Sequence, residues 1–115
     1  MPELVQRFFH AMQAGADGAA TLLALFADDA VYVEPFSGEE RTHEGIDAIR
    51  EALRPGWEQP LPDLSITVDR ADTDGDRITA DWTCRSPALP GGEGHGTNVF
   101  HVDGGRIQRL HTSLS

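Results

Sequence analysis

A single acidic residue placed between two aromatic residues is the first candidate for chemistry in this sequence. Glu34 follows the short β-prone segment AVYV (30–33), and Pro35 and Phe36 come directly after it. Side chains alternate across a strand, so Tyr32, Glu34 and Phe36 are expected to share one face. That face would present a carboxylate between two aromatic rings.

The Glu34 carboxylate has two interpretations. It is either a charge that reaches water at the end of a strand or a general base held in an apolar pocket. Most carboxylates in proteins are exposed, which favours the first interpretation. In a pocket, loss of hydration would raise the pKa of the glutamate toward the range in which it can accept and return a proton. The choice depends on whether the rest of the chain builds a cavity for this face.

Other reactive residue types form no recognised catalytic or metal-binding pattern. The nine basic residues are all arginine, so Schiff-base catalysis and a phosphate-loop lysine are excluded. The five histidines lack the i, i+4 spacing of a zinc-binding helix. The single cysteine, Cys84, excludes an intrachain disulfide. We expect neither a metal nor a cofactor.

The composition indicates one globular domain over residues 1–115. Hydrophobic residues make up 39% of the chain and charged residues 24%, close to the average for globular proteins. No apolar run approaches the roughly 18 residues of a membrane helix, and the N-terminal segment lacks the pattern of a signal peptide, so we expect a cytoplasmic protein. The formal net charge of −10 argues against binding to nucleic acid or to an anionic membrane.

Hydrophobic periodicity predicts three helices in the first half of the chain. They are expected over residues 3–14, 17–27 and 46–54. Gly15 is expected to end the first helix, Asp17 to cap the second and Pro55 to stop the third. The polar segment 37–45 is expected to be a turn.

A period of two after residue 63 predicts four strands. They are expected over residues 64–69, 78–85, 95–102 and 107–114, with turn signals at Asp74-Gly75 and Gly104-Gly105. The apolar positions of the second strand have two possible environments: they pack on the helices, or they face outward under a second subunit. These positions are Ile78, Ala80, Trp82 and Cys84.

This order of elements predicts an α+β fold. Three N-terminal helices on one face of a curved, mainly antiparallel sheet form a cone, and its open end is a natural small-molecule pocket. Such a pocket would give Glu34 a cavity to face.

Several motifs resemble the nuclear transport factor 2-like superfamily and, within it, the ketosteroid isomerases and SnoaL-like polyketide cyclases. The similarity is densest in VQRF (5–8), ALFADDA (24–30), Glu34-Pro35 and the segment 45–51. These pieces occur in the right order and spacing over most of the chain. Relatives commonly dimerise through the sheet, so the resemblance also implies a homodimer.

The same resemblance implies roles for individual residues. Ketosteroid isomerases move the substrate proton with an acid directly before the proline of this strand, and Glu34 takes that place. Their oxyanion hole uses a tyrosine on the first helix and a protonated aspartic acid on the penultimate strand. The matching positions are Phe8, which has no proton to donate, and Asn98, whose amide can donate. We hypothesise that Tyr32 supplies the missing hydroxyl.

The expected substrate pocket is mainly apolar. It comprises Phe8, Met12, Phe36, Trp57, Asp81, Phe100 and Leu110. Members of the fold similar to limonene epoxide hydrolase activate water or an epoxide with an Asp/Arg/Asp group. Asp81 with Arg85 is interpreted either as a remnant of such a group or as a solvated ion pair.

The resemblance therefore implies a small cofactor-independent enzyme acting on an apolar small molecule such as a steroid, terpenoid or polyketide. The first expectation is proton abstraction next to a carbonyl, with Glu34 as the base and double-bond isomerisation as the result. The second is a SnoaL-like or epoxide hydrolase-like cyclase. The third is a non-catalytic module for small-ligand binding or dimerisation, because a fold alone does not determine function.

Overall fold

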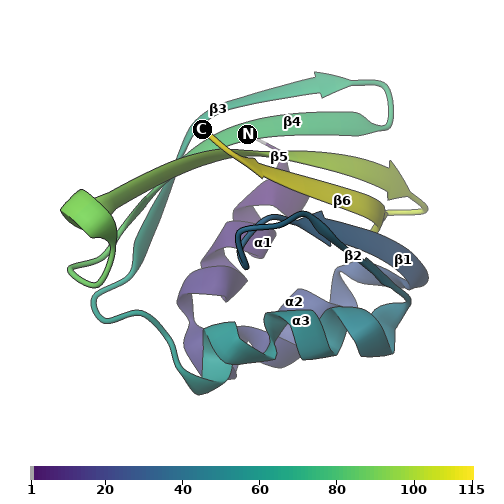
Figure 1. The fold of residues 1–115 in the computed structure, drawn as a ribbon. Helices are drawn as coiled ribbons and strands as arrows, with labels where there is room; N and C mark the ends of the chain where they lie inside the picture. Colours follow the sequence, from purple (N-terminus) through teal and green to yellow (C-terminus); the bar gives the residue numbers. More distant parts are fainter. Residues whose placement is uncertain (1) are drawn as a thin grey trace.

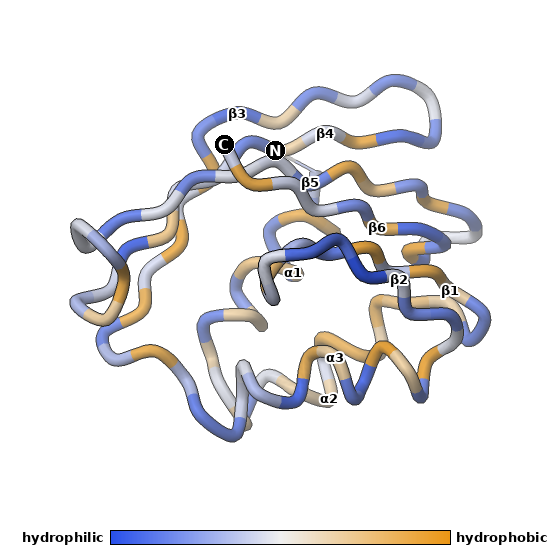
Figure 2. Tube along the Cα trace, viewed as in Figure 1, coloured by the Kyte–Doolittle hydropathy of each residue, from blue (hydrophilic) through white to orange (hydrophobic). Residues whose placement is uncertain are grey.

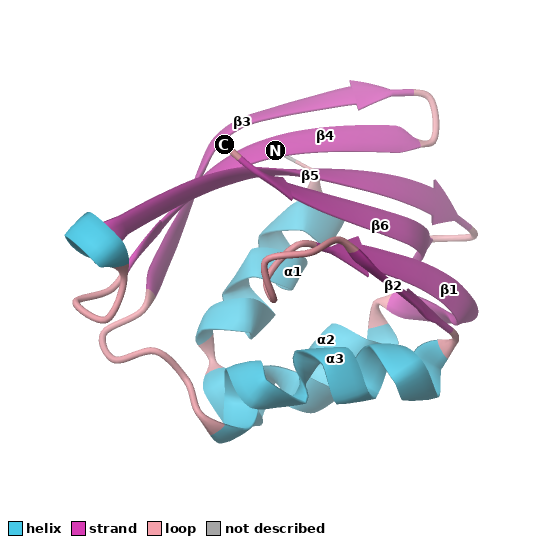
Figure 3. Cartoon of the chain, viewed as in Figure 1, coloured by secondary structure: helices cyan, strands magenta, loops and turns pink. Residues whose placement is uncertain are grey.

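Three α-helices cover one face of a curved six-stranded sheet in the computed structural model, which describes residues 2–115 (Figures 1 and 3). The helices are α1 (Glu3–Gln13), α2 (Ala19–Ala24) and α3 (Ile46–Glu58), with short 3₁₀ turns at Gly15–Gly18 and Pro90–Gly92. The strands are β1 (Phe26–Glu34), β2 (Arg41–Glu44), β3 (Ser65–Asp74), β4 (Arg77–Arg85), β5 (Glu93–Asp103) and β6 (Arg106–Leu114). This arrangement confirms the predicted α+β class. In the part of the chain described, no helix is long and apolar enough to cross a membrane.

The strands lie in the order β2-β1-β6-β5-β4-β3. The pair β1–β6 is parallel, whereas β1–β2, β3–β4, β4–β5 and β5–β6 are antiparallel. Register irregularities between Val68 and Arg70 and between His101 and Val102 help to bend the sheet, because an extra residue kinks a strand. The sheet therefore curves around the helices, as Figure 1 shows.

The hydrophobic core lies between the concave face of the sheet and the helices. Ile78, Ala80 and Trp82 of β4 are buried on this face and belong to the same cluster as Val5 and Phe8 of α1. Figure 2 shows the alternation of apolar and polar residues along the strands that produces this one-sided burial. The apolar positions of β4 thus pack on the helices, and the outward-facing alternative is wrong. Dimerisation through the sheet stays a prediction.

The second helix is shorter than predicted. A 3₁₀ turn precedes α2, Asp17 makes no capping hydrogen bond, and β1 already begins at Phe26. The sheet determines this boundary, because the Ile107 amide donates to the Leu25 carbonyl at 2.7 Å and Phe26 pairs with Ile107. Tertiary pairing outweighs the helical propensity of this segment.

Two other predicted boundaries are wrong. The third helix continues through Pro55 to Glu58, so Trp57 lies in its last turn rather than after it. Residues 41–44 form the edge strand β2 instead of a turn. Arg41 and His43 of this strand bind the Glu34 carboxylate of β1. These contacts stabilise the pairing of a segment that has no apolar alternation.

Gly18 provides a test of the packing between α1 and the 3₁₀ turn. A Cβ at Gly18 would clash with the Ala11 carbonyl oxygen and lie 2.9 Å from the Ala14 Cβ. We expect Gly18→Ala to lower the free energy of unfolding by about 1–3 kcal/mol, the usual cost of overpacking. A Cβ at Gly56, inside α3, would meet no atom within 4 Å. Gly56→Ala should stabilise by about 0.5–1 kcal/mol. Urea unfolding measures both, and equal effects would contradict the close approach.

Candidate functional site

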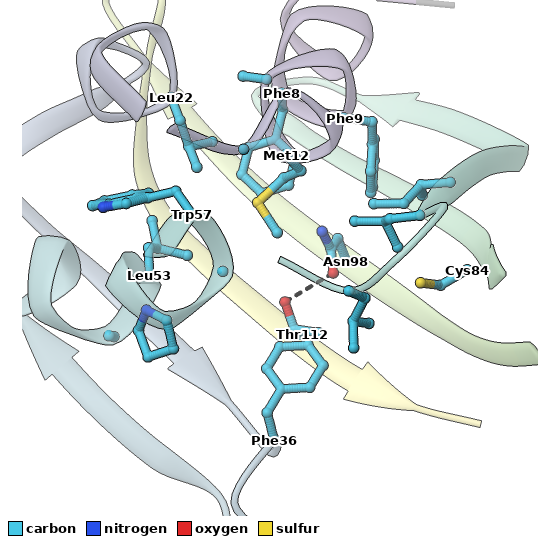
Figure 4. Close-up of a pocket in the computed structure, with 18 of the residues that line it drawn as sticks. Phe8, Phe9, Met12, Leu22, Phe36, Leu53, Trp57, Cys84, Asn98 and Thr112 are labelled. Carbon is cyan, nitrogen blue, oxygen red and sulfur yellow. Dashed lines mark hydrogen bonds between the residues drawn. The ribbon is translucent and has the colours of Figure 1, made fainter. Parts of the chain in front are cut away.

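A cavity of about 320 Å³ occupies the open end of the space between the helices and the sheet. Its volume lies at the lower end of the range of about 300–1,000 Å³ typical of ligand pockets. Apolar side chains from α1, α3 and β4 form most of its wall, among them Phe9, Met12, Leu53 and Trp57. Figure 4 shows Met12 and Leu53 entering from the helices, while Asn98 and Thr112 come from the sheet.

Asn98 and Thr112 form the polar end of this apolar cavity. The Asn98 Oδ1 atom accepts two hydrogen bonds, one from the Trp82 Nε1 at 3.1 Å and one from the Thr112 hydroxyl at 2.8 Å. All three residues are buried and line the cavity. Within residues 2–115, no group accepts a hydrogen bond from the Asn98 Nδ2. Every fully buried side-chain polar atom of this range is paired, so the unpaired Nδ2 is accessible from the cavity. The Asn98 NH₂ group is therefore a free donor facing the cavity.

The Tyr32 hydroxyl belongs to the same polar group. Tyr32 lines the cavity and its phenol lies within hydrogen-bonding reach of Thr112. The Thr112 hydroxyl donates its proton to Asn98, and its nearness to the Tyr32 phenol lowers the pKa of Tyr32 by less than burial raises it. Burial, and secondly the negative charge of Glu34, raise the pKa of Tyr32 far above its ordinary value. The phenol consequently stays protonated at physiological pH.

Glu34 lies on the same sheet face as Tyr32 but outside the lining of the cavity. Its Oε1 atom accepts the Phe36 amide at 2.8 Å. Its Oε2 atom accepts from His43 at 2.8 Å and from the Arg41 guanidinium at 2.9 Å. Only 2% of Glu34 is exposed, so this ion pair is buried on the carboxylate side, while the Arg41 side chain is 53% exposed.

The pKa of Glu34 is lowered, not raised as the sequence suggested. Burial by itself raises this pKa, but hydrogen bonds from His43 and from the Phe36 amide, together with the charge of Arg41, outweigh burial. Glu34 is therefore ionised at neutral pH and is a weaker base than an ordinary glutamate. The expected environment between two aromatic rings is also wrong, because Phe36 is 55% exposed at the mouth of the cavity.

Four of the predicted pocket residues line the cavity, and three do not. Phe8, Met12, Phe36 and Trp57 are in its wall. Phe100 and Leu110 are fully buried in the core instead, away from the lining. Asp81 lies on the outer face of β4, because its neighbours Ala80 and Trp82 occupy the concave face.

Asp81 and Arg85 do not form an ion pair with each other. The Thr97 hydroxyl donates to Asp81 at 2.7 Å, and Arg85 lies 3.4 Å from Glu93. Both pairings link β4 to β5 across the outer face of the sheet. The structure therefore offers no epoxide-opening group at these positions.

Several residues that shape the site carry no recognisable signal in the sequence. Thr112 and Trp82 lie at ordinary alternating positions of β6 and β4. Their hydrogen bonds to Asn98 follow from the pairing of these strands with β5, which the sequence alone does not give. Arg41 and His43 come from a segment with the composition of a turn. In the part of the chain described, no group of three or more His, Cys, Asp or Glu side chains is arranged to hold a metal ion.

The Glu34 ion pair provides a pH-dependent test. The pKa of Glu34 is lower in the folded chain than its ordinary value of 4.5, so the ionised carboxylate stabilises the fold above that pH and loses this effect as the pH falls through the folded pKa. At pH 7 we expect Glu34→Gln to lower the free energy of unfolding by about 1.5–3 kcal/mol, the value of a hydrogen bond to a charged group. The deficit should shrink below the ordinary pKa.

A matched control is Glu40→Gln, because Glu40 is exposed and pairs only with His111, at 3.1 Å, among the described residues. This variant should change stability by no more than about 0.5 kcal/mol. Urea unfolding at a series of pH values measures both variants. A Glu34→Gln deficit that is constant with pH would contradict the stabilising role of the ionised carboxylate.

Comparisons with known proteins agree with this architecture. The SnoaL-like domain family matches residues 5–110. A putative polyketide cyclase from Sinorhizobium meliloti is 24% identical over 98% of this chain and 95% of its own, with a TM-score of 0.80. A protein from Catenulispora acidiphila with a ketosteroid isomerase-like fold, solved with trimethylamine, is 20% identical over 100% of this chain and 87% of its own, with a TM-score of 0.79.

A putative ketosteroid isomerase from Kribbella flavida is 19% identical over 97% of this chain and 75% of its own, with a TM-score of 0.74. At these identities the likeness concerns the fold. None of the curated proteins matches the chain significantly. The match over residues 5–110 nevertheless covers nearly the whole sequence, and the chain belongs to the SnoaL-like domain family.

Proposed function

We propose that this chain is a small cofactor-independent enzyme that binds an apolar molecule with a carbonyl group in its cavity. The observation that carries the proposal is the free Asn98 NH₂ donor at the polar end of an otherwise apolar cavity. A carbonyl oxygen is the group such a donor recognises. Steroids, terpenoids and polyketides combine a large apolar surface with a carbonyl of this kind.

The same donor is suited to stabilise developing negative charge. When a proton is lost from the carbon next to a carbonyl, charge moves to the carbonyl oxygen, and a fixed donor in an apolar site then gains strength. The Asn98 amide is held by two hydrogen bonds to its oxygen, so little reorganisation is needed. The names of the structural neighbours, which include a putative ketosteroid isomerase and a putative polyketide cyclase, support this class of chemistry.

Glu34 is the proposed base for this proton transfer. It is an ionised, buried carboxylate on the sheet face that carries Tyr32, and therefore has the protonation state of a base. It would take a proton from the carbon next to the carbonyl and return it to another carbon, so that the double bond moves. Because Glu34 lies outside the cavity lining and is bound by Arg41 and His43, its side chain must turn from these partners to reach substrate.

The second candidate function is non-catalytic binding of the same class of ligand. The observation that favours it is that both oxygens of Glu34 are hydrogen-bonded to other residues of the chain. In this arrangement the carboxylate stabilises the fold and is not directed at a ligand. A binding protein needs the cavity and Asn98 but no base. A cyclase of the SnoaL-like type would also use the cavity and the Asn98 donor, without any contribution from Asp81 and Arg85.

Ligand binding can be measured with the two tryptophans of the chain, Trp57 and Trp82, because both line the cavity. A 3-oxo steroid should change their fluorescence in a saturable way. Ala52→Phe, which places a ring on a cavity-lining position of α3, should weaken binding at least about tenfold, because it fills space that the ligand needs.

The control is Glu51→Phe, which places the same ring on the exposed face of α3. It should bind the steroid like the unchanged protein. Equal affinities of both variants would contradict binding in this cavity.

Turnover separates the two candidate functions. With a 3-oxo-Δ5 steroid, we expect isomerisation that Glu34→Gln slows about 10²–10⁴-fold, the usual contribution of a general base. Asn98→Leu should slow it about 10²–10³-fold, the usual loss of one oxyanion donor. The control Glu40→Gln should leave the rate unchanged. Saturable binding without any turnover would favour the binding module, and equal rates for Glu34→Gln and the unchanged protein would exclude Glu34 as the base.

A further inference from the structure

The orientation of the Asn98 amide is set by one neighbour, Trp82. We propose that Trp82 is a specificity-determining residue: by fixing the amide with its NH₂ group toward the cavity, it selects ligands whose polar group accepts a hydrogen bond and rejects ligands whose polar group only donates. This inference rests on the proposed binding of an apolar ligand in the cavity, and it adds to that proposal the hydrogen-bonding character of the ligand.

The two hydrogen bonds to the Asn98 Oδ1 are not equivalent. A threonine hydroxyl can donate or accept, so Thr112 would bond equally well to the oxygen or to the nitrogen of the amide. The indole Nε1–H only donates. If the amide turned over, its NH₂ group would face the Trp82 N–H, now at 3.1 Å from Oδ1. Thr112 could accept from that NH₂ group, but the Trp82 N–H would lose its acceptor and meet another donor. Trp82 therefore excludes the turned amide, whereas Thr112 does not.

Gly96 lets the Trp82 ring reach this position. Trp82 on β4 pairs with Gly96 on β5, and Asn98 lies two residues further along the same face of β5. A Cβ at Gly96 would clash with the Trp82 Cζ2 and lie 2.7 Å from both the Trp82 Cε2 and the Ser113 carbonyl oxygen. The indole thus lies across the glycine to reach the Asn98 oxygen, and a side chain at residue 96 would displace it.

The fixed amide gives the cavity a definite preference. A ketone oxygen placed against the Asn98 NH₂ completes the hydrogen bonding of both groups. A donor-only ligand places its own N–H against that NH₂ group, and both then stay unpaired in an apolar surrounding, which is costly. The Oδ1 atom cannot serve such a ligand, because Trp82 and Thr112 occupy both of its lone pairs.

Three bicyclic probes of similar size test the preference by isothermal titration calorimetry. They are 1-indanone, which only accepts, indole, which only donates, and indane, which does neither. We expect all three to enter the cavity and 1-indanone to bind at least about tenfold more tightly than indole, the equivalent of about 1.4 kcal/mol. Indole binding as tightly as 1-indanone while indane binds would overturn the inference but leave the cavity a ligand site. No binding of any probe would overturn both.

Variants assign the preference to Trp82. Trp82→Phe keeps an aromatic ring and removes the N–H, so the amide is free to turn and the ratio of indanone to indole affinity should fall to about one. Gly96→Ala should lower the ratio in the same direction by displacing the indole. Thr112→Val leaves the Trp82 contact intact and should keep most of the ratio. An unchanged ratio in Trp82→Phe, with indane still bound, would overturn the role of Trp82, because a merely structural role would change all three affinities together.

Discussion

The packing of Phe8 is the constraint on which the site depends. Its ring meets those of Phe9, Phe26 and Phe100 in edge-to-face contacts, with centroid distances of 5.1, 6.4 and 5.2 Å. These contacts close the interior at the junction of α1 and the sheet, and Phe8 also lines the cavity beside them. Phe8 therefore lies at the boundary between the packed core and the cavity. The absence of a hydroxyl here leaves Asn98, on the opposite wall, as the donor.

Two polar groups lie on the concave face of the sheet, and they differ in how completely they are paired. At the edge, Glu34 is bound by Arg41, His43 and the Phe36 amide, so its lone pairs are engaged. At the centre, Asn98 has its oxygen engaged and its NH₂ group free. Every fully buried side-chain polar atom of the described residues is paired, so the free NH₂ group is accessible from the cavity and available to a ligand. The centre of the face is therefore the better ligand contact.

Much of the fold could be predicted from the sequence, and less of the site. The change from helical to alternating periodicity predicted α1, α3 and the four strands β3–β6, because burial on one face imposes that period. The strand β2 was missed, since its pairing depends on partners for Glu34 rather than on apolar alternation. The predicted environment of Glu34 was wrong because these partners could not be identified from the sequence. Asn98 was identified through the family resemblance alone, because its donor role depends on Trp82 from another strand.

Tyr32 connects the two polar groups of the concave face. The charge of Glu34, added to burial, holds the proton on the Tyr32 phenol. Thr112 lies beside this phenol, and its hydroxyl donates to the Asn98 oxygen at 2.8 Å. The ion pair at the edge of the sheet therefore acts on Tyr32, which lines the cavity, even though Glu34 does not line it. Through Tyr32, Glu34 contributes to the electrostatics of the site while it stays paired with Arg41 and His43. Only a proton transfer requires Glu34 to move.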